Sequence, residues 1–90
     1  MRVENILKTL ADKTRLKILK ILNKKPLCVC KLPSKLKVSQ PAISQHLKIL
    51  EKNKLLKSKK LGREKKFYLT TSGKIILRTI LKWKKLEVER

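Results

Sequence analysis

VSQPAISQHLKILEKN, residues 38–53, is the stretch that predicts the fold most directly. At 3.6 residues per turn it has one apolar stripe, formed by Ile43, Leu47 and Leu50. Ser39 is a suitable N-cap because its hydroxyl can accept a hydrogen bond from a first-turn amide, and Pro41 fits a first turn, where a missing N–H costs little. Asn53 suits the C-terminal cap. We therefore expect an amphipathic helix over about residues 39–53.

The opposite face of this predicted helix is polar at its start and cationic further along. It carries Pro41, Ser44, Gln45, Lys48 and Lys52. Hydrogen-bonding side chains followed by cations suit a helix that reads base edges in a DNA major groove. An ordinary solvated face has a similar composition, so this pattern alone leaves both interpretations open.

The composition favours a polyanionic partner. The chain of 90 residues carries 26 Lys and Arg against 6 Asp and Glu, a formal net charge of +20, and its apolar content of 41% is that of a folding sequence. We expect one domain, residues 1–90, bound to double-stranded DNA. A lysine-rich surface without a partner, as in proteins that work at high temperature, is an alternative explanation.

Membrane and RNA partners are less favoured. Aromatic anchors or base-stacking platforms would be expected for them, yet the aromatic residues are Phe67, Tyr68 and Trp83 alone. No stretch approaches the ~18 apolar residues of a membrane span, and Glu4 and Lys8 interrupt any signal-peptide pattern. We expect a cytoplasmic, nucleoid-associated protein without a membrane partner.

Hydrophobic periodicity predicts three helices before residue 38. Residues 2–11 form a helix with one apolar face, and Asp12 caps a second helix, to about residue 23, that is apolar around more than half its circumference and forms the centre of the core. A short helix over about residues 29–37 turns Leu32 and Leu36 inward and has Pro33 in its first turn. With the helix at 39–53 it forms a helix-turn-helix.

The hydrophobic period changes after residue 53. Residues 55–61 and 65–69 predict a hairpin around Gly62-Arg63-Glu64, so that the whole wing spans about 55–69. The expected inner side chains are Leu56, Leu61, Phe67 and Leu69, and the cations are Lys57, Lys59, Lys60, Arg63, Lys65 and Lys66. Charge on an edge strand also discourages aggregation, but so many cations beside a polar helix favour phosphate contact.

Residues 71–89 predict a last helix, for which Thr70, Thr71 and Ser72 offer caps. Its apolar residues cover most of the circumference: Ile75, Ile76, Leu77, Ile80, Leu81, Trp83, Leu86 and Val88. A second copy of the chain would supply the apolar surface needed to bury them, which predicts a two-fold dimer that also uses the first helix. The alternative is a helix buried within its own domain.

Three passages resemble the ArsR/SmtB family of winged-helix transcriptional repressors. They are LADKTRLKIL at residues 10–19, LCVCKL at 27–32 and SQPAISQHL at 39–47, within a match over about residues 5–70. The resemblance implies a mainly α winged helix-turn-helix (α-α-α-α-β-β-α) that dimerises through its first and last helices. It also implies a negative regulator whose DNA affinity falls when a metal or other signal binds.

By position, the resemblance assigns base-edge or backbone contacts to Ser39, Gln40, Ser44, Gln45 and His46. The amides of Gln40 and Gln45 have the geometry that pairs with adenine. His46 lies nearer the apolar edge, so a packed, neutral ring touching at most a phosphate is an equal alternative, and Pro41 shapes the helix start or touches a thymine methyl group. The wing cations are expected to contact the flanking DNA backbone or the minor groove: Lys59, Lys60, Arg63, Lys65 and Lys66. Lys48 is a further expected DNA contact.

Cys28 and Cys30 are candidate metal ligands, because thiolates suit arsenite-like species, cadmium, copper(I) or zinc. A helix N-terminus and many lysines should lower their pKa. The family's third arsenic-binding cysteine is replaced by Pro33, and the acidic residue after the second cysteine by Lys31. Two thiolates are incomplete for a trigonal or tetrahedral ion. Metal or metalloid binding, an oxidant response and small buried apolar side chains all stay open.

The chain also lacks the ligand residues of two other metal sites that occur in the family. The N-terminal helix has no cysteine for a four-thiolate cadmium site, and the last helix has Glu87 and Glu89 but no Asp or His for the zinc site. We therefore expect no required cofactor.

Two function classes follow from these patterns. The first is a dimeric, sequence-specific DNA-binding transcriptional regulator, expected to repress. The second is a nucleoid protein that coats DNA without sequence preference, which the charge suits but the polar recognition face does not. An enzyme with a small-molecule substrate is not expected. The chain has a single His and a single Asp, Asp12, and no nucleophile and general base whose spacing in the sequence would place them side by side.

Overall fold

The computed structural model describes the backbone of residues 3–88 and the side chains of residues 3–83. The predicted helix ends at residues 2 and 89 lie outside this range, as do the side chains of Leu86, Glu87, Val88 and Glu89. The described elements are α1 (Val3–Leu10), α2 (Lys13–Lys24), β1 (Leu27–Cys28), a 3-10 turn η1 (Val29–Lys31), α3 (Leu32–Leu36), α4 (Gln40–Lys52), β2 (Leu56–Leu61), β3 (Glu64–Leu69) and α5 (Thr71–Val88).

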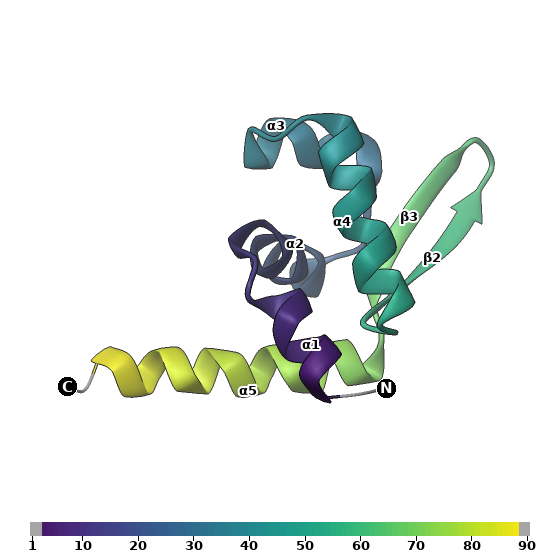
Figure 1. Cartoon of the computed structure of the whole chain (residues 1–90). Helices are drawn as coiled ribbons and strands as arrows, with labels where there is room; N and C mark the ends of the chain where they lie inside the picture. The colour runs from purple at the N-terminus through teal and green to yellow at the C-terminus, as the bar shows by residue number, and fades with distance from the viewer. Residues whose placement is uncertain (1–2, 89–90) are drawn as a thin grey trace.

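Figure 1 shows how these elements are arranged. Helix α5 lies along the base of the molecule, α4 stands above it, and the β2–β3 hairpin projects beside α4. Helix α3 lies at the far end of α4, so that α3 and α4 form the predicted helix-turn-helix. No described helix is both long enough and apolar enough to cross a bilayer.

Helix α2 is the centre of the core, as its broadly apolar sequence predicts. Ile18 and Leu19 are fully buried, and α2 contacts α1, α3, α4, β3 and α5. The Asp12 carboxylate caps it by accepting hydrogen bonds from the amides of Thr14 at 2.8 Å and Arg15 at 3.1 Å. The buried apolar cluster comprises Leu10, Ile18, Leu19, Leu22, Leu27, Leu32, Ile43, Leu47, Leu50, Leu55, Leu56, Phe67, Leu69 and Leu77.

Helix α4 confirms the prediction made for residues 39–53. Ser39 is its N-cap, with the hydroxyl oxygen accepting a bond from the Ala42 amide at 3.4 Å, and Asn53 is its C-cap. The stripe of Ile43, Leu47 and Leu50 is buried. Three residues connect α3 to α4, and the first of them, Lys37, takes the left-handed conformation with φ 56°.

The sheet corrects the predicted element order. Strand β1 was not predicted, and it makes a three-stranded antiparallel sheet in the order β1-β3-β2, with Leu27 opposite Phe67. Its two residues are too few for an alternating pattern to be recognised. The predicted short helix is also divided, because η1 precedes α3.

The hairpin turn is tighter than predicted, since Leu61 pairs with Glu64 and leaves only Gly62 and Arg63 in the turn. Gly62 has φ +63°, which glycine adopts without steric cost. The prediction that Leu61 lies on the inner side is wrong, since its side chain is 50% exposed. Leu56 and Leu61 are five positions apart, and an odd separation turns two side chains to opposite faces of a strand.

Thr70 and Gly73 join the hairpin to α5. The Thr70 amide donates to the Leu55 carbonyl at 3.1 Å, and its hydroxyl oxygen accepts a hydrogen bond from the Gly73 amide at 3.0 Å, which caps α5. This confirms one of the three predicted caps. Buried Leu77, one turn further on, packs α5 into the core.

Candidate nucleic-acid interface

The outward face of α4 is hydrogen-bonding at its start and cationic towards its end. Its exposed residues are Ser39, Gln40, Pro41, Ser44, Gln45, Lys48 and Lys52. The buried stripe fixes this direction, because the apolar side chains on the other side of the helix are held in the core. The structure thus brings together all the predicted α4 contact residues except His46.

The wing carries its cations in opposed pairs. In the β2–β3 ladder Lys59 lies directly opposite Lys66, and Lys60 directly opposite Lys65. Like charges in these positions repel and destabilise a hairpin, and an anion bound beside them relieves the repulsion. Arg63 is exposed in the turn beyond them. Lys66 is half-buried, and the Lys65 ammonium lies 5.4 Å from the centre of the Phe67 ring.

A side-chain hydrogen bond holds the wing against α4. The Ser58 hydroxyl of β2 donates to Glu51 of α4 at 3.1 Å. Because α4 and the hairpin lie side by side (Figure 1), this bond helps to fix the polar helix face and the basic wing as one surface. The sequence pattern did not indicate this pair, since the two residues are seven positions apart, one near the end of a helix and the other in a strand.

His46 is half-buried, and its Nδ1 accepts a hydrogen bond from Arg15 Nε at 3.1 Å. An Nδ1 that accepts this hydrogen bond leaves Nε2 as the donor atom of the ring. Of the two alternatives for His46, this geometry favours the packed ring. Although partial burial raises the pKa of the nearby Asp12 carboxyl, hydrogen bonds from the Arg15 and Thr14 amides and the proximity of His46 and Arg15 leave that pKa below its ordinary value.

The two cysteines differ in their surroundings. Cys28 is 8% exposed, and its sulfur accepts a hydrogen bond from the Cys30 amide at 3.3 Å, whereas Cys30 is exposed. The expectation of a lowered pKa is wrong for Cys30: a side-chain hydrogen bond with Cys28, together with slight burial and the charges of Cys28 and Glu64, raises the pKa of the Cys30 thiol. Within the described residues no group of three or more His, Cys, Asp and Glu could hold a metal ion.

An apolar groove lies away from these residues, between α1 and α5. It has a volume of about 440 Å³ and is lined by Val3, Ile6, Leu7, Leu10, Ala11, Ile76, Thr79, Ile80 and Trp83. Three of the large apolar side chains that line it remain more than half exposed: Val3 at 66%, Leu7 at 53% and Trp83 at 54%. Large apolar side chains gathered on one exposed face indicate an interaction surface.

Known proteins share this sequence and this fold. Residues 12–58 match the family described as bacterial regulatory protein, arsR family. An uncharacterized HTH-type transcriptional regulator of Methanocaldococcus jannaschii is 42% identical over 69 residues, which are 76% of this chain and 78% of that protein. The arsenical resistance operon repressor of Staphylococcus xylosus is 39% identical over 67 residues, which are 74% of this chain but only 64% of that protein.

The fold is also that of a homodimeric winged helix-turn-helix DNA-binding domain from Mycobacterium bovis. The TM-score is 0.77 at 17% identity, with 97% of this chain and 78% of that chain covered. The fold, the match over residues 12–58 and the identity to the archaeal regulator agree. This chain therefore belongs to the ArsR family and is a winged helix-turn-helix DNA-binding transcriptional regulator.

Proposed function

We propose that the protein is a homodimeric repressor that binds two half-sites of a DNA operator. The observation that supports this most is the joining of a polar helix face and a basic wing into one surface, with an apolar groove elsewhere on the domain. The arsenical resistance operon repressor of Staphylococcus xylosus supports the repressing role. A DNA partner would place the protein with the chromosome, in the cytoplasm.

In this proposal α4 lies in the major groove. Gln40, Ser44 and Gln45 contact base edges, because amide and hydroxyl side chains can donate and accept there. Lys48 and the wing cations hold the phosphates on either side, which fixes the register without reading the sequence. His46 touches a phosphate at most, through the hydrogen at Nε2.

The apolar groove between α1 and α5 is the surface by which two copies pair. A two-fold axis through it would bring each exposed Leu7 and Trp83 against the partner and remove them from water. The homodimeric domain from Mycobacterium bovis has the same fold, which supports this assembly. Two recognition helices one helical turn of DNA apart would then read a palindromic site.

Gln40→Ala and Lys60→Ala are expected to differ in kind. After sites are selected from random DNA, Gln40→Ala should relax the preference at one base position by about 1–3 kcal/mol. Lys60→Ala should weaken binding to every DNA alike and lower the salt slope by about 1. The measurement is binding to the selected site and to bulk DNA at two salt concentrations.

The same titration tests the nucleoid alternative. A coating protein would bind the selected site and bulk DNA with a ratio near one, while both affinities fall steeply with salt. That outcome for the wild-type protein would contradict the proposed function. Identical effects of the two substitutions would show that the recognition face lies elsewhere.

A thiol-directed signal is proposed to release the DNA. The two sulfurs alone do not complete a trigonal or tetrahedral site, so a metal or metalloid would need a further ligand from a partner chain, water or a small thiol. Cys28 and Cys30 lie beside Leu32 and the start of α3, so binding there would disturb the helix-turn-helix.

To identify the signal, DNA binding is titrated in the absence of oxygen with one reagent at a time: arsenite, cadmium, zinc, copper(I) or peroxide. We expect one of them to lower affinity for the selected site by about tenfold or more, a usual size for a coupled effector. Cys28→Ser and Cys30→Ser should each remove this response, whereas Ser34→Ala, which changes a nearby exposed hydroxyl, should preserve it. Unchanged binding with all five reagents would mean that the thiols are structural.

A further inference from the structure

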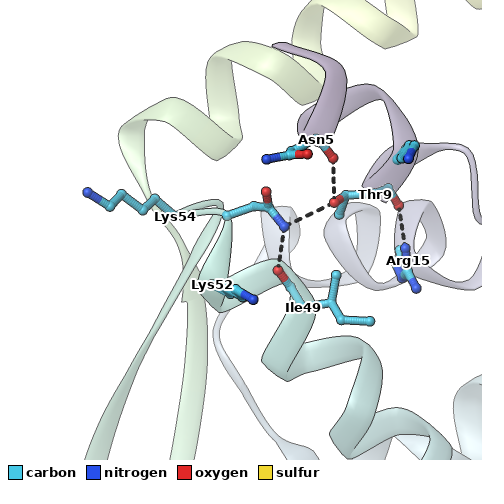
Figure 2. Close-up of a pocket in the computed structure, with 8 residues that line it drawn as sticks. Asn5, Thr9, Arg15, Ile49, Lys52 and Lys54 are labelled. Atoms are coloured by element: carbon cyan, nitrogen blue, oxygen red, sulfur yellow. Dashed lines mark hydrogen bonds between the residues drawn. The ribbon is translucent and has the colours of Figure 1, made fainter. Parts of the chain in front are cut away.

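Helices α1, α2 and α4 meet at the end of α1 around Thr9, a polar side chain that is only 3% exposed. Its hydroxyl donates to the Asn5 carbonyl at 2.7 Å and accepts from Asn53 Nδ2 at 3.0 Å. Figure 2 shows Thr9 between Asn5 and Arg15, with hydrogen bonds on both sides. The hydrogen bond from Asn53 therefore joins α1 to the C-cap of the recognition helix.

Arg15 supplies a second link. Its Nη1 donates to the Thr9 carbonyl at 3.3 Å, and its Nε donates to His46 Nδ1 at 3.1 Å. The guanidinium group thus bridges the end of α1 and the middle of α4, which its planar fork of donors allows. Asn53 Nδ2 also donates to the Ile49 carbonyl at 2.9 Å, so the amide that reaches Thr9 is itself held by α4.

These links hold α4 at two points, His46 and Asn53. They are seven residues apart, about two helical turns or ~10 Å along the axis. A helix held at one point can pivot about it, whereas two separated points fix its direction.

Polar bonds cross an open space between α1 and the end of α4. A pocket of about 500 Å³ lies there, lined by residues of both helices and by Arg15 (Figure 2). Since side chains do not fill this space, the direct links between α1 and the end of α4 are these hydrogen bonds, whereas each helix packs its apolar side against α2. Hydrogen bonds are directional, and apolar burial is not.

We propose that Thr9, Arg15, His46 and Asn53 form a polar clamp that sets the spacing between the two recognition helices of the dimer. The inference rests on the proposed dimer, because α1 lines the groove at which the copies pair. A clamp between α1 and α4 makes the orientation of the recognition helix depend on the orientation of the dimer interface. All four are positioning residues in this role.

The double variant Thr9→Val/Arg15→Lys tests the clamp without changing the formal charge of the chain. Val keeps the branched shape of Thr but lacks its hydroxyl, and Lys keeps the charge of Arg but lacks its fork. Thr9→Ser, which retains the hydroxyl, is the matched control. Each protein is titrated with duplexes in which two selected half-sites are separated by the natural spacing or by one to three base pairs more or less.

Wild-type protein and Thr9→Ser should prefer the natural spacing by about tenfold or more, as expected for two helices held on a rigid frame. The double variant should prefer the natural spacing by about threefold or less, because each recognition helix still reads its half-site while the distance between the two helices varies. Its dimer dissociation constant and salt slope should match the wild-type values. A change confined to stability would not alter the spacing profile.

A double variant with the wild-type spacing profile would overturn the clamp and leave the proposed function intact. A wild-type protein without any spacing preference would overturn the proposed dimeric reading of DNA, and the clamp with it. Thermal unfolding accompanies each titration. If the double variant is unfolded, Thr9→Val alone decides, because it removes one link at constant shape and should at least halve the spacing preference.

Discussion

Leu7→Glu is expected to convert the protein to a monomer and to weaken operator binding by about 100-fold or more. A carboxylate buried in an apolar interface costs several kcal/mol, and two-fold symmetry places two of them there. Leu7 is 53% exposed in the single domain, so the fold itself should be unaffected. Sedimentation equilibrium and binding to a full site and to a half-site measure the two effects.

Thr71→Glu is the matched control for this substitution. It changes the charge by the same amount on α5, at an exposed residue that does not line the groove. It also puts a carboxylate in a first helical turn, which is favourable. A Leu7→Glu protein that remains a dimer would show that the copies pair through another surface.

Gly73→Ala is expected to lower the free energy of unfolding by about 3 kcal/mol or more, because overpacking against backbone leaves little room to relax. Gly73 is buried in the first turn of α5, and a methyl group there would overlap the Leu55 carbonyl oxygen. That oxygen already accepts a hydrogen bond from the Thr70 amide. Because the obstacle is backbone, α5 would have to move away from Leu55, the residue directly before β2.

Gly62→Ala provides the comparison for Gly73→Ala. Nothing lies within 4 Å of a methyl group at Gly62, but φ is +63°, so the expected cost is only the ~1 kcal/mol of a left-handed residue. Urea unfolding of both variants gives the two free energies. Equal losses would mean that the contact at Gly73 relaxes and that α5 is not held tightly against the hairpin.

The elements that local rules control could be predicted. The recognition helix begins after Ser39 and ends before Asn53 because its caps and its apolar period are written in consecutive residues. The same holds for α2, where Asp12 caps a helix whose apolar circumference identifies it as the centre of the core. The polar face of α4 follows from the same periodicity.

The errors came from features that need a partner strand or a measured geometry. A two-residue strand such as β1 has no pattern of its own and exists because β3 lies beside it. Cys30 was expected to have a lowered pKa from a helix N-terminus and nearby lysines, but a side-chain hydrogen bond with Cys28 raises that pKa. Leu61 is different, since counting residues along β2 would have placed it on the outer face.

The sequence by itself determined that this chain has a helix-turn-helix with a polar recognition face, a basic wing and surplus apolar surface on its first and last helices. Hydrophobic periodicity and helix capping involve residues that are close together in the chain, so both can be recognised in a single sequence. Only the tertiary structure showed that Arg15 reaches His46, 31 residues away, and that Asn53 reaches Thr9, 44 residues away. These contacts depend on how separate helices pack, because a hydrogen bond forms only when both partners are brought within about 3 Å.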